Sequence, residues 1–245
     1  MRFAVLISGN GSNLQAIIDA FKKGNINAEL ALVVSSNSKA YGLKRAEAAG
    51  IKTMVFSPKD YTNTQSVDRD MIIHLKQEKI DFIVLAGYMR VLTPFFIKKY
   101  PKKIINIHPA LLPSFKGANG IKDTFTYGCK IAGVTVHFVN EKVDNGPIIM
   151  QEAIKIKAED TLDTLEEKIH KIEHRVYPKA IALFAEEKLK VKARQVTILD
   201  KPADEEPKQG KYRPAKRNPP KTHPLTVAEE HAPVVIKPHP PMVAE

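Results

Sequence analysis

The stretch that decides the fold is residues 3–21, which reads FAVLISGNGSNLQAIIDAF. Its first five residues form a continuous apolar run, typical of a strand buried on both faces. Apolar side chains then recur at the three-to-four spacing of a helix face, at Leu14, Ile17, Ile18 and Phe21. The polar residues 8–13, with two glycines, separate the two patterns. The sequence therefore predicts a strand, a tight loop and a helix.

Strand-like and helical segments keep alternating up to residue 107. Further strands are expected over residues 30–34, 52–56, 82–86 and 103–107, and helices over 41–49, 67–77 and 94–100. This order predicts a parallel sheet with right-handed crossovers.

The pattern changes after residue 132. Residues 134–139 and 148–156 read as two strands around Gly146-Pro147, which predicts an antiparallel edge. A long amphipathic helix is expected over 161–187. We therefore expect an α/β fold: a Rossmann-like, mostly parallel sheet with helices on both faces, an antiparallel C-terminal edge and a long C-terminal helix.

Composition limits the kind of protein. The single cysteine, Cys129, excludes an internal disulfide framework and a cysteine-rich zinc module. No apolar run approaches the roughly 20 residues that span a bilayer, and the N-terminal apolar run is too short for a signal peptide. We expect a soluble, cytoplasmic protein that acts on no membrane.

The C-terminal part has a different composition. Ten of the 17 prolines fall between Pro202 and Pro241, and this stretch is too polar to form a core. We expect a catalytic domain over residues 1–199 and a disordered Pro/Lys-rich tail over 200–245. A basic cluster at residues 211–221 indicates either a partner contact or a solubilising tail, and we expect no specific nucleic-acid partner.

The loop over residues 8–13 suits a phosphate. Glycines let backbone N–H groups approach an anion, and the helix N-terminus adds the positive end of its dipole. A dinucleotide loop would have a third glycine where Leu14 stands, and an acidic residue at the end of the second strand. A phosphate monoester is therefore favoured over NAD, and a tight turn without ligand is the alternative.

Candidate catalytic groups follow the fifth predicted strand. Asn106 and His108 lie on the same side of that strand by alternation, at the carboxyl end where open parallel sheets bind ligands. An Asn amide can donate to an oxyanion and a His can move a proton near neutral pH. Asp144, in the segment VDNGP, could hold that ring. The alternatives are a hydrogen-bonded core histidine and a turn-forming aspartate.

Four segments together resemble a known family: SGNGSN at 8–13, AGYMRVL at 86–92, NIHPALLPSF at 106–115 and VHFVNEKVDNGPII at 136–149. They are similar to the phosphoribosylglycinamide formyltransferases, folate-dependent enzymes of purine synthesis. The resemblance covers residues 2–193. It implies formyl transfer from 10-formyltetrahydrofolate, as co-substrate, to the amine of phosphoribosylglycinamide, with no metal ion. The resemblance does not fix the oligomeric state, and a homodimer is one possibility.

The resemblance also implies roles for individual residues. Asn106, His108 and Asp144 resemble the catalytic trio. The acceptor substrate would bind at Gly11, Ser12, Asn13, Pro109, His170 and Glu173, with Glu173 receiving its amine. The folate would bind at Met89, Arg90, Val91, Leu92, Asn106, Asn140, Glu141, Val143 and Asp144. Where the family often has an arginine ahead of the third helix, this chain has Thr64, and residues 118–120 lack the family's histidines; both changes concern folate affinity.

Other functions are open to the sequence. Methionyl-tRNA formyltransferase and formyltetrahydrofolate deformylase resemble the chain around the trio, but carry additional domains. His170-Lys171-Ile172-Glu173-His174 spells the zinc pattern H-x-x-E-H of a metallopeptidase, although no further ligand cluster accompanies it. A non-catalytic nucleotide-binding protein is the third alternative.

Overall fold

A computed structural model describes residues 1–201, so the predicted tail lies almost wholly outside the described part of the chain. A seven-stranded sheet with strand order β3-β2-β1-β4-β5-β6-β7 forms its centre. The strands are β1 (Arg2–Ile7), β2 (Glu29–Ser35), β3 (Thr53–Val55), β4 (Phe82–Leu85), β5 (Ile104–His108), β6 (Ile131–Phe138) and β7 (Ile148–Lys155). The first five strands run parallel to one another. Strand β6 pairs antiparallel with β5 on one side and with β7 on the other. The predicted fold class is confirmed.

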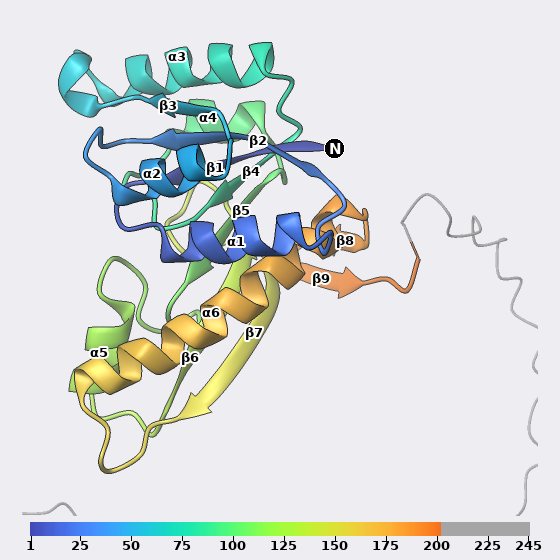
Figure 1. The fold of residues 1–245 in the computed structure, drawn as a ribbon. Coiled ribbons are helices and arrows are strands. Elements are labelled where there is room, and N and C mark those ends of the chain that lie inside the picture. Colours follow the sequence, from blue (N-terminus) through green and yellow to red (C-terminus); the bar gives the residue numbers. More distant parts are fainter. Residues whose placement is uncertain (202–245) are drawn as a thin grey trace, which may run out of the picture. The chain divides into compact units, whose positions relative to one another are not determined.

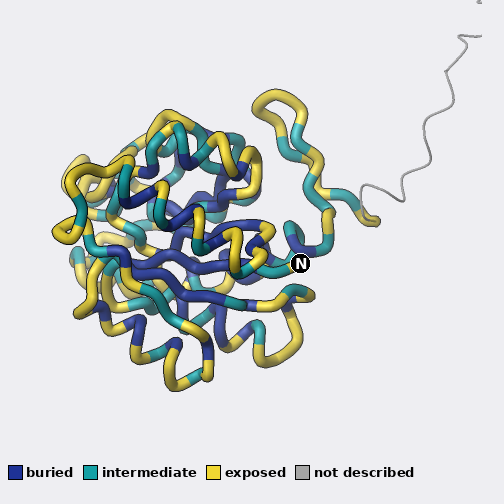
Figure 2. The backbone as a smooth tube through the Cα atoms, turned by 90° about the horizontal axis from the view of Figure 1, so that it is seen from above, coloured by how far each residue is buried: buried dark blue, intermediate teal, exposed yellow. Residues whose placement is uncertain are grey.

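Helices cover both faces of the sheet (Figure 1). Their bounds are α1 (Ser12–Lys22), α2 (Tyr41–Ala48), α3 (Thr64–Gln77), α4 (Pro94–Lys99), α5 (Gly120–Thr126) and α6 (Leu162–Ala185), with a 3₁₀ turn, η1, at Pro58–Asp60. The alternation of β1 explains the layers: Phe3, Val5 and Ile7 pack in the core beneath α1, α2 and α6, whereas Ala4 and Leu6 pack beneath α3 and α4. Figure 2 shows the buried strands between helices whose outer turns are exposed.

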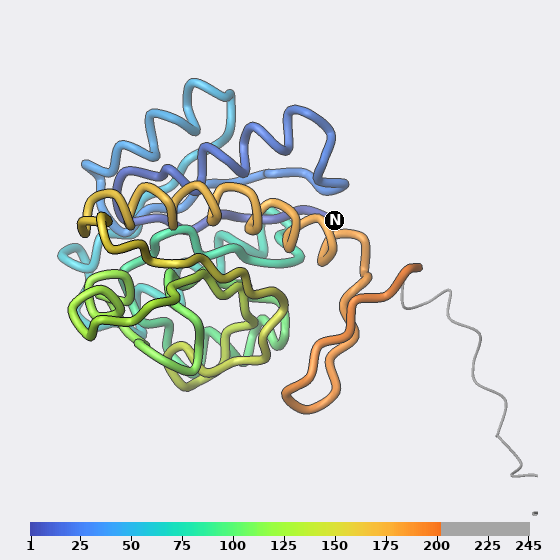
Figure 3. Tube along the Cα trace, turned by 90° about the horizontal axis from the view of Figure 1, so that it is seen from below, coloured from blue at the N-terminus to red at the C-terminus, as the bar shows by residue number. Residues whose placement is uncertain are grey.

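The long helix α6 lies against α1 and the sheet (Figures 1 and 3). The Tyr177 hydroxyl, fully buried, lies 2.7 Å from the Leu85 carbonyl oxygen and 3.1 Å from that of Ile105. This anchor ties α6 to the middle of the sheet. No helix within residues 1–201 combines the length and the apolar character that crossing a membrane requires.

Four elements were not predicted: the 3₁₀ turn η1, the short helix α5 and the two strands of a hairpin. The short helix α5 begins at a glycine and shows no clear apolar period, and the hairpin of β8 (Leu189–Lys192) and β9 (Gln195–Ile198) follows α6 directly. Figure 3 shows this hairpin leaving the end of α6. All four are too short for a local pattern to indicate them.

Strand order sets the position of the site. The chain moves outward from β1 to β2 and β3, then returns to place β4 on the other side of β1. Ligands bind at such a switch point, beyond the carboxyl ends of the strands. The loops after β1 and β4 meet there: Ser8 N donates to the Gly87 carbonyl at 3.0 Å, and Met89 N donates to the Ser8 hydroxyl at 2.9 Å.

Candidate active site

All of the predicted site residues line one cleft of about 610 Å³ at this switch point. They come from five segments that are far apart in the sequence. They are Gly11, Ser12, Asn13, Met89, Arg90, Val91, Leu92, Asn106, His108, Pro109, Asn140, Glu141, Val143, Asp144, His170 and Glu173. The geometry therefore brings the predicted residues together, while their roles stay predictions.

The glycine loop has the geometry of an anion site. Gly11 precedes α1 with φ 76°, a left-handed conformation, and a Cβ there would lie 2.8 Å from the Gly42 Cα. Glycine thus allows α1 to begin at Ser12 with its first N–H groups free of partners within the helix. Arg45 adds positive charge: its Nε donates to the Asn10 carbonyl at 3.0 Å.

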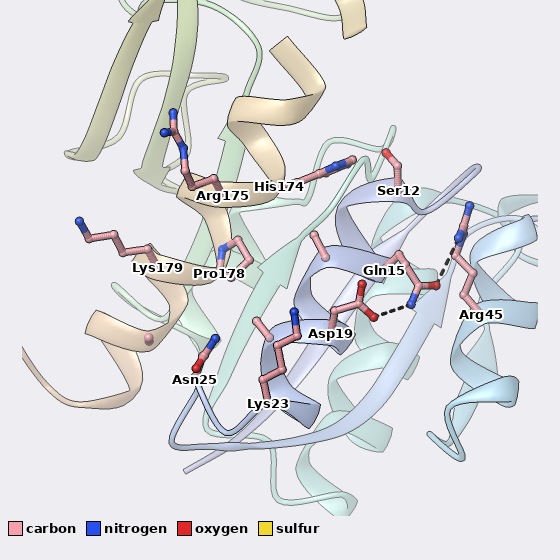
Figure 4. Close-up of a pocket in the computed structure, with 13 residues that line it drawn as sticks. Ser12, Gln15, Asp19, Lys23, Asn25, Arg45, His174, Arg175, Pro178 and Lys179 are labelled. Carbon is pink, nitrogen blue, oxygen red and sulfur yellow. Dashed lines mark hydrogen bonds between the residues drawn. The ribbon is translucent and has the colours of Figure 1, made fainter. Parts of the chain in front are cut away.

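A second hollow, of about 700 Å³, lies between α1 and α6 and shares Ser12 with the cleft (Figure 4). It contains His174 and Arg45, but no member of the predicted trio. The Arg45 Nη1 donates to Gln15 Oε1 at 3.2 Å there. The two hollows are of similar volume, but the groups suited to acyl chemistry stand in the cleft, which is therefore the candidate active site.

The predicted trio meets beyond the end of β5. Asn106 and His108 stand on β5, and Asp144 lies in the loop between β6 and β7. Asp144 Oδ2 lies 3.5 Å from His108 Nδ1, and the Gly117 N–H donates to the same oxygen at 2.9 Å. The carboxylate is thus held by backbone as well as by side chain.

Both ring nitrogens of His108 face oxygen acceptors. Nδ1 faces the Asp144 carboxylate, and Nε2 lies 2.7 Å from the Phe115 carbonyl oxygen. A neutral imidazole has one N–H and can donate to only one of them. A protonated His108 would satisfy both acceptors, and the ring is buried.

His137 joins Asn106 to Asp144 and is missing from the predicted set. Its Nε2 lies 3.1 Å from Asn106 Nδ2 and 3.6 Å from Asp144 Oδ1, and its Nδ1 lies 2.8 Å from the Phe138 carbonyl oxygen. Because a carbonyl only accepts, neutral His137 carries its proton on Nδ1 and accepts an N–H of Asn106 at Nε2. The second N–H of the Asn106 amide stays available to a ligand.

The sequence held one signal that could have pointed to His137: a histidine within the otherwise largely apolar strand over residues 134–139.

The electrostatics of Asp144 favour its charged form. Burial pushes its pKa upward, but the Gly117 N–H and the charge of a protonated His108 lower it. His137 adds a hydrogen bond and a charge in its protonated form, in which its Nε2 donates to Asp144 and no longer accepts from Asn106. The pKa of Asp144 therefore lies below its usual value of 3.8. The group is a carboxylate at neutral pH.

Glu173 has the opposite environment. It is 5% exposed on α6, and Asn13 Nδ2 donates to its Oε2 at 3.1 Å. Burial raises the pKa of Glu173 to about 7, and the Asn13 hydrogen bond offsets only part of this. The contact joins the glycine loop to α6 across 160 residues.

We expect Glu173→Gln to remove a pH-dependent loss of stability. Because Glu173 binds its proton more tightly in the folded protein, the wild-type free energy of unfolding falls as pH rises from the usual glutamate pKa of 4.5 through the raised pKa of about 7, by up to about 3 kcal/mol. An amide has no such dependence. Denaturant unfolding at about pH 5 and about pH 8 measures it. The exposed Glu167→Gln on the same helix should keep the wild-type slope; an equal slope in Glu173→Gln would contradict the expectation.

The H-x-x-E-H pattern does not assemble a ligand set. His170 lines the cleft, His174 lines the second hollow, and Glu173 is bonded to Asn13. The two histidine rings are nearly parallel at 6.4 Å. Within residues 1–201, no group of three His, Cys, Asp or Glu side chains could hold a metal ion.

Comparison with known proteins identifies the family of the chain. Residues 1–181 match the family described as formyl transferase. Phosphoribosylglycinamide formyltransferase of Bacillus subtilis is 46% identical over 180 residues, covering 74% of this chain and 92% of that protein. The phosphoribosylglycinamide formyltransferase of Haemophilus influenzae is 44% identical, and the match covers 78% of this chain and 90% of that protein. The trifunctional purine biosynthetic protein adenosine-3 of Gallus gallus is 47% identical, but the chain spans only 18% of its length.

Solved structures agree as well. The crystal structure of glycinamide ribonucleotide transformylase 1 from Symbiobacterium toebii superposes with a TM-score of 0.80 at 43% identity, covering 82% of this chain and 94% of that one. Identity and coverage of this order, together with the match over residues 1–181, place the chain within one family. The chain belongs to the formyl transferase family, among its phosphoribosylglycinamide formyltransferases.

Proposed function

We propose that this chain transfers the formyl group of 10-formyltetrahydrofolate to the amine of 5-phosphoribosylglycinamide in purine biosynthesis, and that Asn106, His108 and Asp144 carry the transfer. One observation supports this proposal most strongly: the three groups line the same cleft as the glycine loop over residues 8–13 and the partly apolar loop over residues 89–92. Such a cleft suits an acceptor with a phosphate and a flat, partly apolar donor.

The acceptor lies at the α1 end of the cleft. Backbone N–H groups of Gly11, Ser12 and Asn13 bind its phosphate. Glu173, one hydrogen bond away from Asn13, accepts from its amine. His170 and Pro109 line the cleft beside it.

The donor lies between two loops that face each other across the cleft. Met89, Arg90, Val91 and Leu92 follow β4, and Asn140, Glu141 and Val143 precede Asp144. Met89 and Val91 are 73% and 67% exposed, and Val143 is 52% exposed. Exposed apolar side chains gathered at a cleft are typical of a surface that a ligand covers.

The transfer needs stabilisation of negative charge on the formyl oxygen. The uncharged amine attacks the formyl carbon, and the C–N bond to the folate breaks as the new C–N bond is completed. The free N–H of Asn106 and the charge of His108 stabilise the oxygen. Asp144 keeps His108 charged and in place. The proton lost by the attacking nitrogen reaches the departing folate nitrogen, so no proton is gained or lost overall.

Formyl transfer measured with a 10-formyl folate analogue, with and without phosphoribosylglycinamide, tests the proposal. We expect release of the deformylated folate only when the acceptor is present, with one formyl group gained per folate released. Release without the acceptor would indicate a deformylase instead. Binding of the acceptor with no transfer would indicate a non-catalytic nucleotide-binding protein.

Two further predictions concern the setting of the enzyme. It works in the cytoplasm, as suits a step of purine biosynthesis, and a homodimer is the assembly considered for it. Cell fractionation tests the first and sedimentation of the full chain tests the second; a monomer at working concentration would overturn the second.

A further inference from the structure

The loop between β4 and α4 lines the cleft without regular secondary structure. It runs from residue 86 to residue 93 and contains Met89 and Val91. Two backbone hydrogen bonds hold its start, from Ala86 N to the Leu6 carbonyl at 2.9 Å and from Ser8 N to the Gly87 carbonyl at 3.0 Å. From residue 88 onward, its shape depends mainly on side-chain contacts. One end is held by Ser8, whose hydroxyl accepts from Met89 N at 2.9 Å.

The other end is held by Asp68, a side chain of α3 that stands outside the cleft. Asp68 is 0% exposed, and its Oδ2 accepts from the Thr93 N–H at 2.8 Å. Thr93 is the residue that caps α4, since its hydroxyl accepts from Phe96 N at 3.2 Å. One carboxylate therefore sets where the loop ends and where α4 begins.

Asp68 also holds the middle of the loop through charge. Its Oδ1 lies 3.9 Å from Arg90 Nη2, and the Arg90 side chain is only 13% exposed. Arg90 Nη1 donates to the Tyr88 hydroxyl at 3.3 Å. At this distance the contact is electrostatic and not a hydrogen bond, and both atoms are buried without a hydrogen-bond partner. Because each charge has the other as its opposite charge, moving either side chain would leave both charges unpaired. The side chain of Arg90 is thus engaged with α3, and the loop backbone follows it.

We propose that Asp68 is a positioning residue for the donor: from behind the cleft, it sets the shape of the loop that binds the folate, through Arg90 and Thr93. The inference rests on the proposed function, because it takes that loop as the folate side of the cleft. Asp68 touches no substrate. Its effect should therefore fall on the donor and spare the acceptor, whose loop after β1 it does not contact.

The test compares Asp68→Asn with Asp70→Asn. The first variant keeps the shape of the side chain and an oxygen for Thr93 N, but removes the charge that pairs with Arg90. Asp70 is matched in chemistry and lies on the same helix, where it pairs with Tyr61 and His74 instead. We expect Asp68→Asn to raise KM for the 10-formyl folate analogue about tenfold, with kcat and KM for the acceptor within about twofold of wild type. Asp70→Asn should leave all three unchanged.

Arg90→Gln provides the second arm. If the two residues act as a pair, Arg90→Gln raises the same KM, and the double variant raises it no further than the larger single effect. Circular dichroism and thermal unfolding of each variant separate this result from general loss of fold, which would lower the active fraction and hence kcat.

Unchanged donor KM in a folded Asp68→Asn enzyme, or equal rises for donor and acceptor, would overturn the inference alone. Fully multiplicative effects of the two substitutions would also overturn it. A wild-type protein that transfers no formyl group would instead overturn the proposed function, and the inference with it.

Discussion

Replacing Asn106 by alanine is expected to lower kcat by about 10²–10³, the usual cost of losing one oxyanion donor. The amide lies 3.1 Å from His137, which accepts one of its N–H bonds and leaves the other for the formyl oxygen. Alanine removes that donor while the buried strand around it stays apolar. Steady-state transfer with both substrates saturating measures the effect.

Two further variants sharpen this result. Asn106→Asp has nearly the same shape but offers no N–H when ionised, so it should be as impaired as alanine. Asn25→Ala, in the second hollow, is the matched control and should retain wild-type kcat. Normal turnover of Asn106→Ala would remove the amide from the proposed mechanism.

Asp144→Asn is expected to lower kcat by about 10²–10³, within the range of general acid–base and charge-stabilising groups. The pKa of Asp144 lies below its usual value, so the wild type has a carboxylate beside His108 throughout the neutral range. An amide there supplies no charge to hold an imidazolium. The expected loss should shrink as pH falls, because acid favours an imidazolium even where no carboxylate stands beside the ring.

The pH dependence distinguishes charge loss from simple misplacement. Turnover of wild type and Asp144→Asn is measured from about pH 6 to about pH 9, with Asp163→Asn, an exposed residue of α6, as control. Asp163→Asn should follow the wild-type profile. A constant ratio between wild type and Asp144→Asn at every pH would contradict the role of its charge, and a kcat within about twofold of wild type would contradict any catalytic role.

Much of the fold was predictable because its signals are local. The central parallel strands β1 and β4 are buried on both faces and read as apolar runs, and the long helix α6 shows the period of its buried face. The short helix α5 and the β8–β9 hairpin were missed, since seven and four residues hold too little pattern. Residue types at the strand ends also indicated the cleft, because parallel strands end at one edge of the sheet.

The contacts that give the site its chemistry were not local. His137 faces Asn106 across the antiparallel ladder of β5 and β6, and Asp68 meets Arg90 and Thr93 only because α3 packs against the loop after β4. Nothing in the neighbouring residues marks either pairing. Both follow from register and from the packing of distant elements.

By itself, the sequence determined the order of strands and helices, the glycine loop, and the presence of an amide, an imidazole and a carboxylate suited to acyl transfer. Only the tertiary structure decided which of these groups are buried and what they face. Glu173 and Asp144 show the difference: both are carboxylic acids in the same cleft, yet burial raises the pKa of one to about 7 and donors lower the pKa of the other. Desolvation and hydrogen bonding set the charge of each, and both depend on packing between residues far apart in the chain.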